Sequence, residues 1–399
     1  MLATRHMERY AEVLLWALAT ARKKRLKKGD LVLLRFHKPA IEQAEVVYRR
    51  LLASGFNPVP RLSPTTRMEK DFFQLADNRQ LAAKIPGDDV LCQNLAGAIY
   101  LHAPESITHL QDIDSKRISR YTLSRKYLRD ILDRREAEGS FGWTLCILPT
   151  RQQARHAGLT LQQYSDQVIK ACFLHRQDPV AQWKKVYRRI NRIKKWLNSL
   201  EIDYLHVESK NVDLKIVPGR RRIWAGLSGH NIPSFEIFLS PDWRGTKGYY
   251  FADQPTYRSG NYVAGIHLEF SRGSVVRARA EKGDDFLQGQ LAIDRGARRL
   301  GEFSLTDRRF SKIKRFMANT LFDENFGGRH GNCHIALGAS YTDTFAGNPA
   351  RLTAREKKEL GFNDSALHWD LVNTESKRVT AKLTGGNKTT IYENGIFKV

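Results

Sequence analysis

Residues 29–36, Gly-Asp-Leu-Val-Leu-Leu-Arg-Phe (GDLVLLRF), set the fold class of the first half of the chain. Their last six residues form a short apolar run after a Gly-Asp turn, which is typical of a buried strand. Residues 41–52 have the apolar spacing of a helix, and Gly-Phe-Asn-Pro at 55–58 predicts its end before another extended segment. Residues 143–148 (WTLCIL) have the pattern of a second buried strand. This order predicts an α/β domain with a mainly parallel sheet.

The second half of the chain has a different pattern. Apolar and polar residues alternate between Gly, Asn and Ser, which is typical of antiparallel strands. We expect such strands at residues 204–207, 212–216, 249–251, 263–270 and 274–280. Helices are expected at 284–294 and 312–319. The second half is therefore predicted to be α+β.

A long basic amphipathic helix at residues 181–200 is expected to link the two halves. The chain has 399 residues, which is long for one domain. We therefore predict an α/β N-terminal domain at 1–195 and an α+β C-terminal domain at 196–399.

The N-terminal segment is apolar over residues 11–21 (AEVLLWALATA), as in a secretory signal. Glu8 and Glu12 interrupt that pattern, and the apolar side chains fit one face of a helix instead. No apolar run approaches the ~20 residues that span a bilayer. The four cysteines include no Cys-x-x-Cys pair, which indicates unpaired thiols in a reducing compartment. We expect a cytoplasmic protein with no membrane segment.

The chain carries a formal net charge of +24, with 66 Lys and Arg against 42 Asp and Glu. Dense basic runs occur at residues 22–28, 184–195 and 220–222. Such runs attract polyanions without specificity, so non-specific polyanion binding is expected. A nucleic-acid-binding surface and a solvated basic face with no partner both account for this pattern.

Three separate patterns carry residues that can bind metals. In His368-Trp369-Asp370, residues i and i+2 of a strand point to the same side, so imidazole and carboxylate can share an ion. The pattern alone is equally that of an ordinary strand. Glu236 and Glu302 lie in apolar surroundings, where a glutamate is either the solvent-facing residue of a strand or a buried ligand.

The third pattern is the stretch 320–341, TLFDENFGGRHGNCHIALGASY. His334 and Tyr341 are seven residues apart, and two helical turns would place them on one face. The alternative interpretation is a Gly-rich loop followed by a turn of small residues. Neither interpretation is excluded by the residues alone.

Together, five segments resemble the thermophilic-type metallo-aminopeptidases, the family of aminopeptidase T, AmpS and PepS. The segments lie at 231–238 (NIPSFEIF), 294–305 (DRGARRLGEFSL), 320–325 (TLFDEN), 333–341 (CHIALGASY) and 368–370 (HWD). Their order and spacing, including the 66 residues between Glu236 and Glu302, are far more specific than any one segment.

The resemblance implies a centre of two divalent metals in the C-terminal half. The implied ligands are Glu236, Glu302, His334, His368 and Asp370, with Glu324 as a further ligand. It also implies that Tyr341 is the catalytic tyrosine and that the protein is a homodimer. Two features depart from the family. The chain has extra residues at 326–332, which include the loop residue His330. Its net charge is positive, whereas the family is usually acidic.

The implied ligands suit peptide hydrolysis. Two metals can activate a water molecule and polarise a carbonyl group, while carboxylates can bridge them. Histidine ligands favour zinc, cobalt or manganese over magnesium. We expect an exopeptidase that removes N-terminal residues from peptides with a free α-amine. Glu302 is also the candidate for receiving the proton of the water, and Tyr341 for hydrogen bonding to the tetrahedral intermediate.

Two alternatives stay open. A basic nucleic-acid-binding protein on the same scaffold would explain the +24 charge and predicts steeply salt-dependent binding. An inactive homologue would have a metal site broken by the extra residues at 326–332. Neither explains why the complete ligand set stands in order, and the metal content of the protein distinguishes them from the enzyme.

Overall fold

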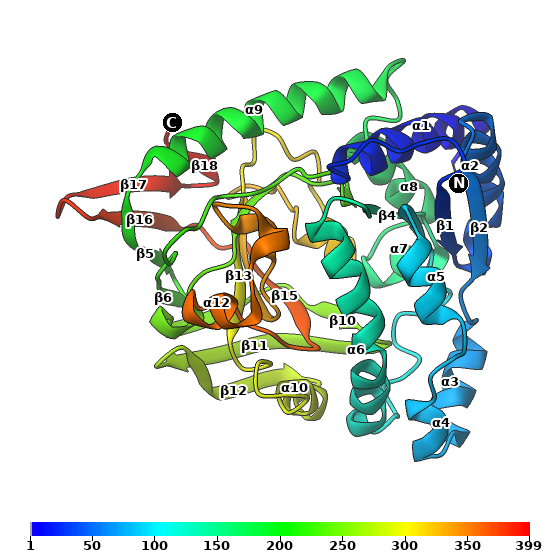
Figure 1. Cartoon of the computed structure of the whole chain (residues 1–399). Helices are drawn as coiled ribbons and strands as arrows, with labels where there is room; N and C mark the ends of the chain where they lie inside the picture. The colour runs from blue at the N-terminus through cyan, green and yellow to red at the C-terminus, as the bar shows by residue number, and fades with distance from the viewer. Residues whose placement is uncertain (1) are drawn as a thin grey trace. The chain divides into compact units, whose positions relative to one another are not determined.

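The structure is a computed structural model that describes residues 2–399 (Figure 1). It divides into two compact units. The first comprises the chain up to Val186 together with Leu227–Ser234 and Met317–Leu321. The second comprises Tyr187–Gly226, Phe235–Phe316 and Phe322–Val399. Within residues 2–399, no helix is both long and apolar enough to cross a bilayer.

The first unit is built on a parallel sheet of five strands in the order β2-β1-β3-β4-β7. All four pairings are parallel. The strands are β1 (Leu31–Phe36), β2 (Asn57–Leu62), β3 (Gly97–His102), β4 (Trp143–Ile147) and β7 (Asn231–Ile232). The predicted α/β N-terminal region with a parallel sheet is confirmed.

Helices connect these strands, as parallel pairing requires. The first helix, α1 (Thr4–Ala21), buries the predicted apolar face, with Tyr10, Leu14 and Leu18 fully enclosed. The next, α2 (Ile41–Ala53), follows β1 as expected. The others are α3 (Thr66–Leu75), α4 (Asn78–Ala82), α5 (Asp88–Asn94), α6 (Ser115–Ala137), α7 (Arg151–His156) and α8 (Leu161–Ala171). Helix α9 (Pro179–Ser199) covers the predicted basic amphipathic segment.

The second unit contains two antiparallel sheets. The larger follows the order β10-β11-β9-β6-β5-β16-β17-β18, with β12 paired to β11. Its strands are β5 (Ile202–Ser209), β6 (Val212–Ile216), β9 (Lys247–Ala252), β10 (Thr256–Arg258), β11 (Asn261–Ser271), β12 (Ser274–Lys282), β16 (Arg378–Leu383), β17 (Lys388–Glu393) and β18 (Ile396–Phe397). These include all five predicted antiparallel strands.

The smaller sheet has the order β15-β14-β13-β8. Its strands are β8 (Glu236–Leu239), β13 (Leu300–Thr306), β14 (Asn332–Gly338) and β15 (His368–Asn373). Nearly every residue of the three strands β8, β13 and β14 is buried, so they lack the alternation that marked the larger sheet in the sequence. Helices α10 (Asp284–Leu291) and α12 (Ala354–Glu359) also lie in this unit. The short helix α11 (Thr320–Asp323) begins in the Met317–Leu321 segment of the first unit and ends in the second.

The helix predicted at residues 312–319 is wrong. This stretch is irregular, and the short helix α11 begins only at Thr320. The carbonyl of Ile313 accepts a hydrogen bond from the backbone N–H of Gly327, and the Ile313 N–H donates to Ser311 Oγ. Ala318 has a φ of +50°, which a right-handed helix excludes. The backbone groups of Ile313 thus have partners outside a helix.

Candidate metal centre

Strand register places five of the predicted ligands on one face of the smaller sheet. On β13, Glu302 and Ser304 point to the same side, because side chains alternate along a strand. Ser304 pairs with His334 of β14. Along β14, Ala336 pairs with Asp370 and Gly338 with His368. At the other edge, Thr306 pairs with Glu236 of β8. The strand that carries the His-Trp-Asp pattern is confirmed as β15.

Small residues stand opposite the larger ones and leave room between them. Glu302 and Asp370 both pair with Ala336, and His334 pairs with Ser304. Gly338, opposite His368, has a φ of +105°, and a Cβ there would lie 2.1 Å from the carbonyl oxygen of Leu367. A larger residue at 338 would therefore displace the strand end that carries His368.

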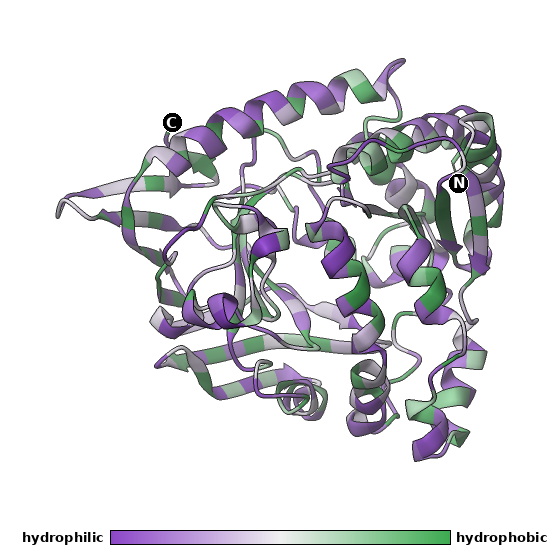
Figure 2. Cartoon of the chain, in the orientation of Figure 1, coloured by the Kyte–Doolittle hydropathy of each residue, from purple (hydrophilic) through white to green (hydrophobic). Residues whose placement is uncertain are grey.

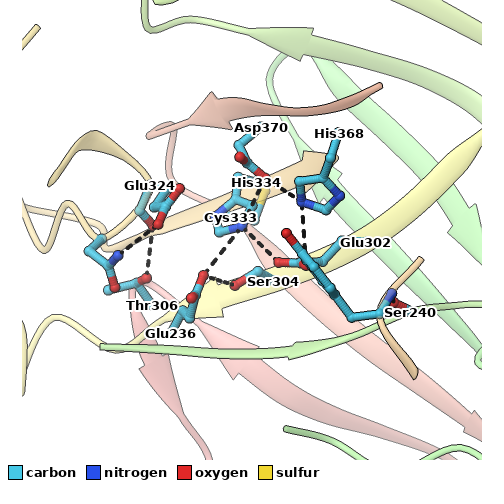
Figure 3. Close-up of polar contacts among 12 residues, drawn as sticks. Glu236, Ser240, Glu302, Ser304, Thr306, Glu324, Cys333, His334, His368 and Asp370 are labelled. Atoms are coloured by element: carbon cyan, nitrogen blue, oxygen red, sulfur yellow. Dashed lines mark hydrogen bonds and ion pairs between the residues drawn. The ribbon is translucent and has the colours of Figure 1, made fainter. Parts of the chain in front are cut away.

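His334 lies at the middle of the cluster (Figure 3). Its Nε2 is 3.2 Å from Glu302 Oε1, 3.4 Å from Glu236 Oε2 and 4.0 Å from Asp370 Oδ1. Ser304 Oγ donates to Glu236 Oε2 at 3.4 Å. One ligand atom each from Glu236, Glu302 and His334 lies within 4.8 Å of the others, which is close enough to share an ion.

His368 is oriented for metal binding through Nε2. Its Nδ1 lies 2.9 Å from the carbonyl oxygen of Ala339, which can only accept, so Nδ1 carries the proton in the neutral ring. The Nε2 atom is 3.3 Å from Asp370 Oδ1 and 3.8 Å from Glu302 Oε2. Figure 3 shows these side chains turned toward one another.

Glu324 joins the cluster from the loop after α11 rather than from the sheet. It is buried, and its carbonyl accepts from Thr306 Oγ1 at 3.2 Å. Asn325 Nδ2 donates to Glu324 Oε1 at 3.3 Å, and Asn325 Oδ1 accepts from the Phe235 backbone N–H. Residues 326–331 form an irregular turn that leads into β14, and His330 lies in this turn as expected.

Burial and the closeness of the carboxylates to one another shift the pKa values of these groups. Burial, with repulsion from Glu302 and Asp370, raises the pKa of Glu236 to about 8 although His334 opposes the shift. Burial and the charges of Glu236, Asp370 and Glu302 hold the pKa of Glu324 well above its usual value. At neutral pH the protein alone therefore does not support four ionised carboxylates here.

The pKa values of the two imidazoles are also raised, but here against the effect of burial. Burial alone would lower the pKa of His334, but the hydrogen bond to Glu302 and the nearby carboxylate charges outweigh it and raise the pKa to about 9. The pKa of His368 is raised for the same reason, chiefly by Asp370. Burial would raise the pKa of Asp370, but His368, His334 and Arg258 lower it to about 2. The raised pKa values show that the cluster favours added positive charge, and the carboxylate and imidazole donors fit divalent cations.

Tyr341 lies next to this cluster but not on the face of a helix with His334. His334 is in a strand that ends at Gly338, so the helical interpretation of their seven-residue spacing is wrong. Tyr341 instead follows the strand, where its N–H donates to Ser240 Oγ at 2.8 Å. Its ring centroid is 4.5 Å from that of His368, and the residue is 40% exposed. The phenol can therefore meet a substrate that approaches the cluster.

Two further residues were not expected from the sequence. Ser304 hydrogen-bonds Glu236, and Arg258 Nη1 donates to the His368 carbonyl at 2.7 Å while its charge lowers the pKa of Asp370. Nothing in a chain this rich in arginine distinguishes Arg258. Ser304 could have been found from strand periodicity, because it lies two residues after Glu302.

A sheet face with clustered carboxylates and imidazoles fits a metal-binding protein, and comparison with known proteins gives the family. The model of the family described as "Thermophilic metalloprotease (M29)" matches residues 3–397. The chain belongs to this family, and the resemblance inferred from the five segments is confirmed.

Curated relatives of the chain carry aminopeptidase names. Aminopeptidase T of Thermus thermophilus is 29% identical over 65% of the chain, and AmpS of Bacillus subtilis is 27% identical over 77%. Aminopeptidase 2 of Geobacillus stearothermophilus is 30% identical over 76% of both chains. The match spans 63% of the length of the Thermus thermophilus relative and 78% of AmpS. The solved structure of wild-type AmpT from Thermus thermophilus has the same fold, with a TM-score of 0.80 over 99% of each chain at 23% identity.

Proposed function

We propose that this protein is an aminopeptidase that uses two divalent metal ions to remove N-terminal residues from peptides. The convergence of four carboxylates, three of them buried, and two imidazoles from five segments carries the proposal. The family and the aminopeptidase names of the relatives support the same reaction class.

We propose six residues as metal ligands: Glu236, Glu302, Glu324, His334, His368 and Asp370. Four carboxylates balance the charge of two divalent cations, and the histidines favour zinc, cobalt or manganese. When bound, such ions supply Lewis acidity and an activated water molecule.

The chain's own residues supply the remaining steps. Glu302 contacts both imidazoles and is the candidate base that takes the proton of the attacking water. Tyr341 is exposed beside His368, where its hydroxyl can donate a hydrogen bond to the developing oxyanion. The free α-amine of the peptide would bind at the centre, which restricts cleavage to the first residue.

We also propose that residues 196–399 are the catalytic domain and that the protein is a cytoplasmic homodimer. We further propose that residues 326–332 leave the metal centre intact. The turn at 326–331 ends where β14 begins, and Glu324 keeps its place beside the carboxylates, which supports the last point.

The test combines metal analysis with a pair of matched peptides. Full-length protein loaded with zinc, cobalt or manganese should hold about two ions per chain and release the first residue of an unblocked peptide. The same peptide with an acetylated N-terminus should be resistant. Equal cleavage of both peptides would contradict the aminopeptidase proposal, and a protein that binds no metal would support an inactive homologue.

A second property, polyanion binding, is favoured by helix α9. Its 21 residues contain no Asp or Glu, and the hydrophilic residues extend along its length in Figure 2. Six exposed basic side chains make no ion pair in the described structure: Lys184, Lys185, Arg188, Arg189, Arg192 and Lys195. We propose that this basic face binds the phosphate backbone of nucleic acids.

The salt dependence of binding to duplex DNA tests this second proposal. The double variant Arg188→Gln/Arg192→Gln should lower the magnitude of the log K against log [salt] slope by about 2, because each lost phosphate contact removes about one unit. The matched control is Arg277→Gln/Arg279→Gln, which removes the same charge from exposed positions of β12. Equal effects of both pairs would show that only the net charge matters.

A further inference from the structure

The first unit contains a cavity of about 370 Å³ that the peptidase proposal does not use. It lies at the carboxyl ends of β1, β2 and β3, and Arg35, His37, Ser63 and His102 are among the residues that line it. In this sheet the chain passes from β1 outward to β2 and then back across to β3 on the other side of β1. The crevice between β1 and β3 is therefore the point where strand order reverses, which is where open parallel sheets bind ligands.

The cavity offers hydrogen-bond donors from several strands. Arg35 is exposed, and its Nε donates to Ser63 Oγ at 3.3 Å, so the terminal nitrogens of the guanidinium remain for a ligand. Arg35 takes part in no ion pair of the described structure. Burial raises the pKa of Tyr100 to about 12, so its hydroxyl keeps its proton. A ligand in the cavity would therefore meet one cation and at least one neutral donor.

The two histidines of the cavity are neutral, and one has an assigned tautomer. His37 Nδ1 accepts a hydrogen bond from the backbone N–H of Ala103 at 3.2 Å, so the ring proton is on Nε2. The ring of His102 packs edge-on against that of His37, with centroids 4.8 Å apart. Burial lowers the pKa of both, that of His102 to about 3. The imidazoles thus add hydrogen-bonding capacity without charge.

A single carboxylate, Glu69 of α3, balances Arg35 at the wall of the cavity. It is paired with His109, whose Nε2 lies 2.8 Å from Glu69 Oε2, but its side chain remains 42% exposed. The rest of the wall includes the apolar side chains of Pro64, Leu101 and Leu145. One cation, one carboxylate and an apolar wall favour neither a simple anion nor a simple cation.

We propose that this cavity binds a free amino acid with an apolar side chain. The α-carboxylate of the amino acid would pair with Arg35 and its α-ammonium group with Glu69, while the side chain packs against Leu101 and Leu145. A zwitterion satisfies both charges, and the volume is in the range of small-molecule sites. This site lies wholly in the first unit and does not depend on the peptidase proposal.

Calorimetric titration of L-leucine and L-phenylalanine into the full-length, metal-loaded protein tests the proposal. Arg35→Gln and Glu69→Gln should each weaken this binding by about tenfold, because each removes a charge-assisted hydrogen bond. Two ligand analogues probe the same pairs from the other side: N-acetyl-L-leucine lacks the ammonium charge and L-leucinamide lacks the carboxylate. Both should bind about tenfold more weakly than L-leucine.

Three matched variants locate the binding. Arg61→Gln on β2 and Glu45→Gln on α2 remove the same charges from exposed positions outside the cavity and should bind as the wild type does. Glu302→Gln alters the candidate metal centre and should also retain binding. Binding lost in Glu302→Gln but kept in Arg35→Gln would assign the amino acid to the metal centre and overturn the proposal. So would equal affinity for N-acetyl-L-leucine, or no binding to the wild type.

Discussion

The candidate metal centre and the cavity between β1 and β3 each contain two imidazoles and at least one carboxylate, yet the pKa values of their imidazoles shift in opposite directions. The pKa values of His334 and His368 are raised, whereas those of His37 and His102 are lowered. Desolvation disfavours the charged ring in all four cases. Only at the metal centre do several carboxylates lie close enough to outweigh it.

The difference shows how the two sites can be distinguished by charge. A cluster that holds more carboxylates than the protein can neutralise must take up protons or metal ions, as the raised pKa of Glu236 indicates. A cavity with one guanidinium, one carboxylate and neutral imidazoles needs no ion. Histidine alone is therefore a poor indicator of a metal site in this chain.

The largest effect is expected from Glu302→Gln. Its carboxylate contacts both His334 and His368, so the substitution removes a proposed metal ligand and the candidate base together. Peptidase activity should fall by roughly 10³-fold or more. Activity on an unblocked peptide and metal content by elemental analysis measure the two losses. The control Glu281→Gln, at an exposed position of β12, should leave both unchanged.

Tyr341→Phe should have the next largest effect, and it separates catalysis from metal binding. Tyr341 is not among the six proposed metal ligands, so metal content should stay at the wild-type level. The loss of an oxyanion donor should lower kcat by about 10²-fold with little change in KM. Tyr249→Phe, on the exposed side of β9, is the matched control. A parallel loss of metal would contradict this assignment.

Glu324→Gln sharpens the comparison by testing how many ions the carboxylates hold. Glu324 reaches the cluster from a loop and is not a member of the three-ligand group of Glu236, Glu302 and His334. We expect the affinity for one of two ions to fall about 10- to 100-fold, with activity recovered at high metal concentration. Titration with cobalt should show one tight and one weakened site. Two unaltered sites would exclude Glu324 as a ligand.

The sequence predicted the parallel half of the fold well because its signals are local. Segments 31–36 and 143–148 are continuous apolar runs between turns, and β1 and β4 end within one residue of the prediction. The failure at 312–319 has the same origin. Ile313 and Met317 are buried four residues apart, as in a helix, but the backbone of this stretch bonds to distant residues.

The site could be predicted only from the joint order of its segments. The His-Trp-Asp pattern is local to one strand, but the pairing of Glu302 and Asp370 with Ala336 depends on contacts between residues far apart in the chain. No periodicity within one segment specifies such a register. The cavity between β1 and β3 could not be predicted for the same reason, because Arg35 and Glu69 lie far apart in the chain and belong to no sequence motif.

The smallest effect is expected at His102, where the comparison predicts a pH dependence without metal. Its pKa is about 3 in the folded protein against an ordinary 6.5, so the unfolded chain takes up a proton that the folded protein does not. The stabilisation is complete above pH 6.5 and is lost as the pH falls toward 3.

In urea titrations of chelator-treated protein, His102→Gln should flatten the pH dependence of the unfolding free energy between pH 6 and 4 by up to about 1 kcal/mol per pH unit. His267→Gln, at an exposed position of β11, should keep the wild-type slope. An unchanged slope in His102→Gln would mean that burial does not keep this imidazole neutral, and the charge balance of the cavity would then favour an anion.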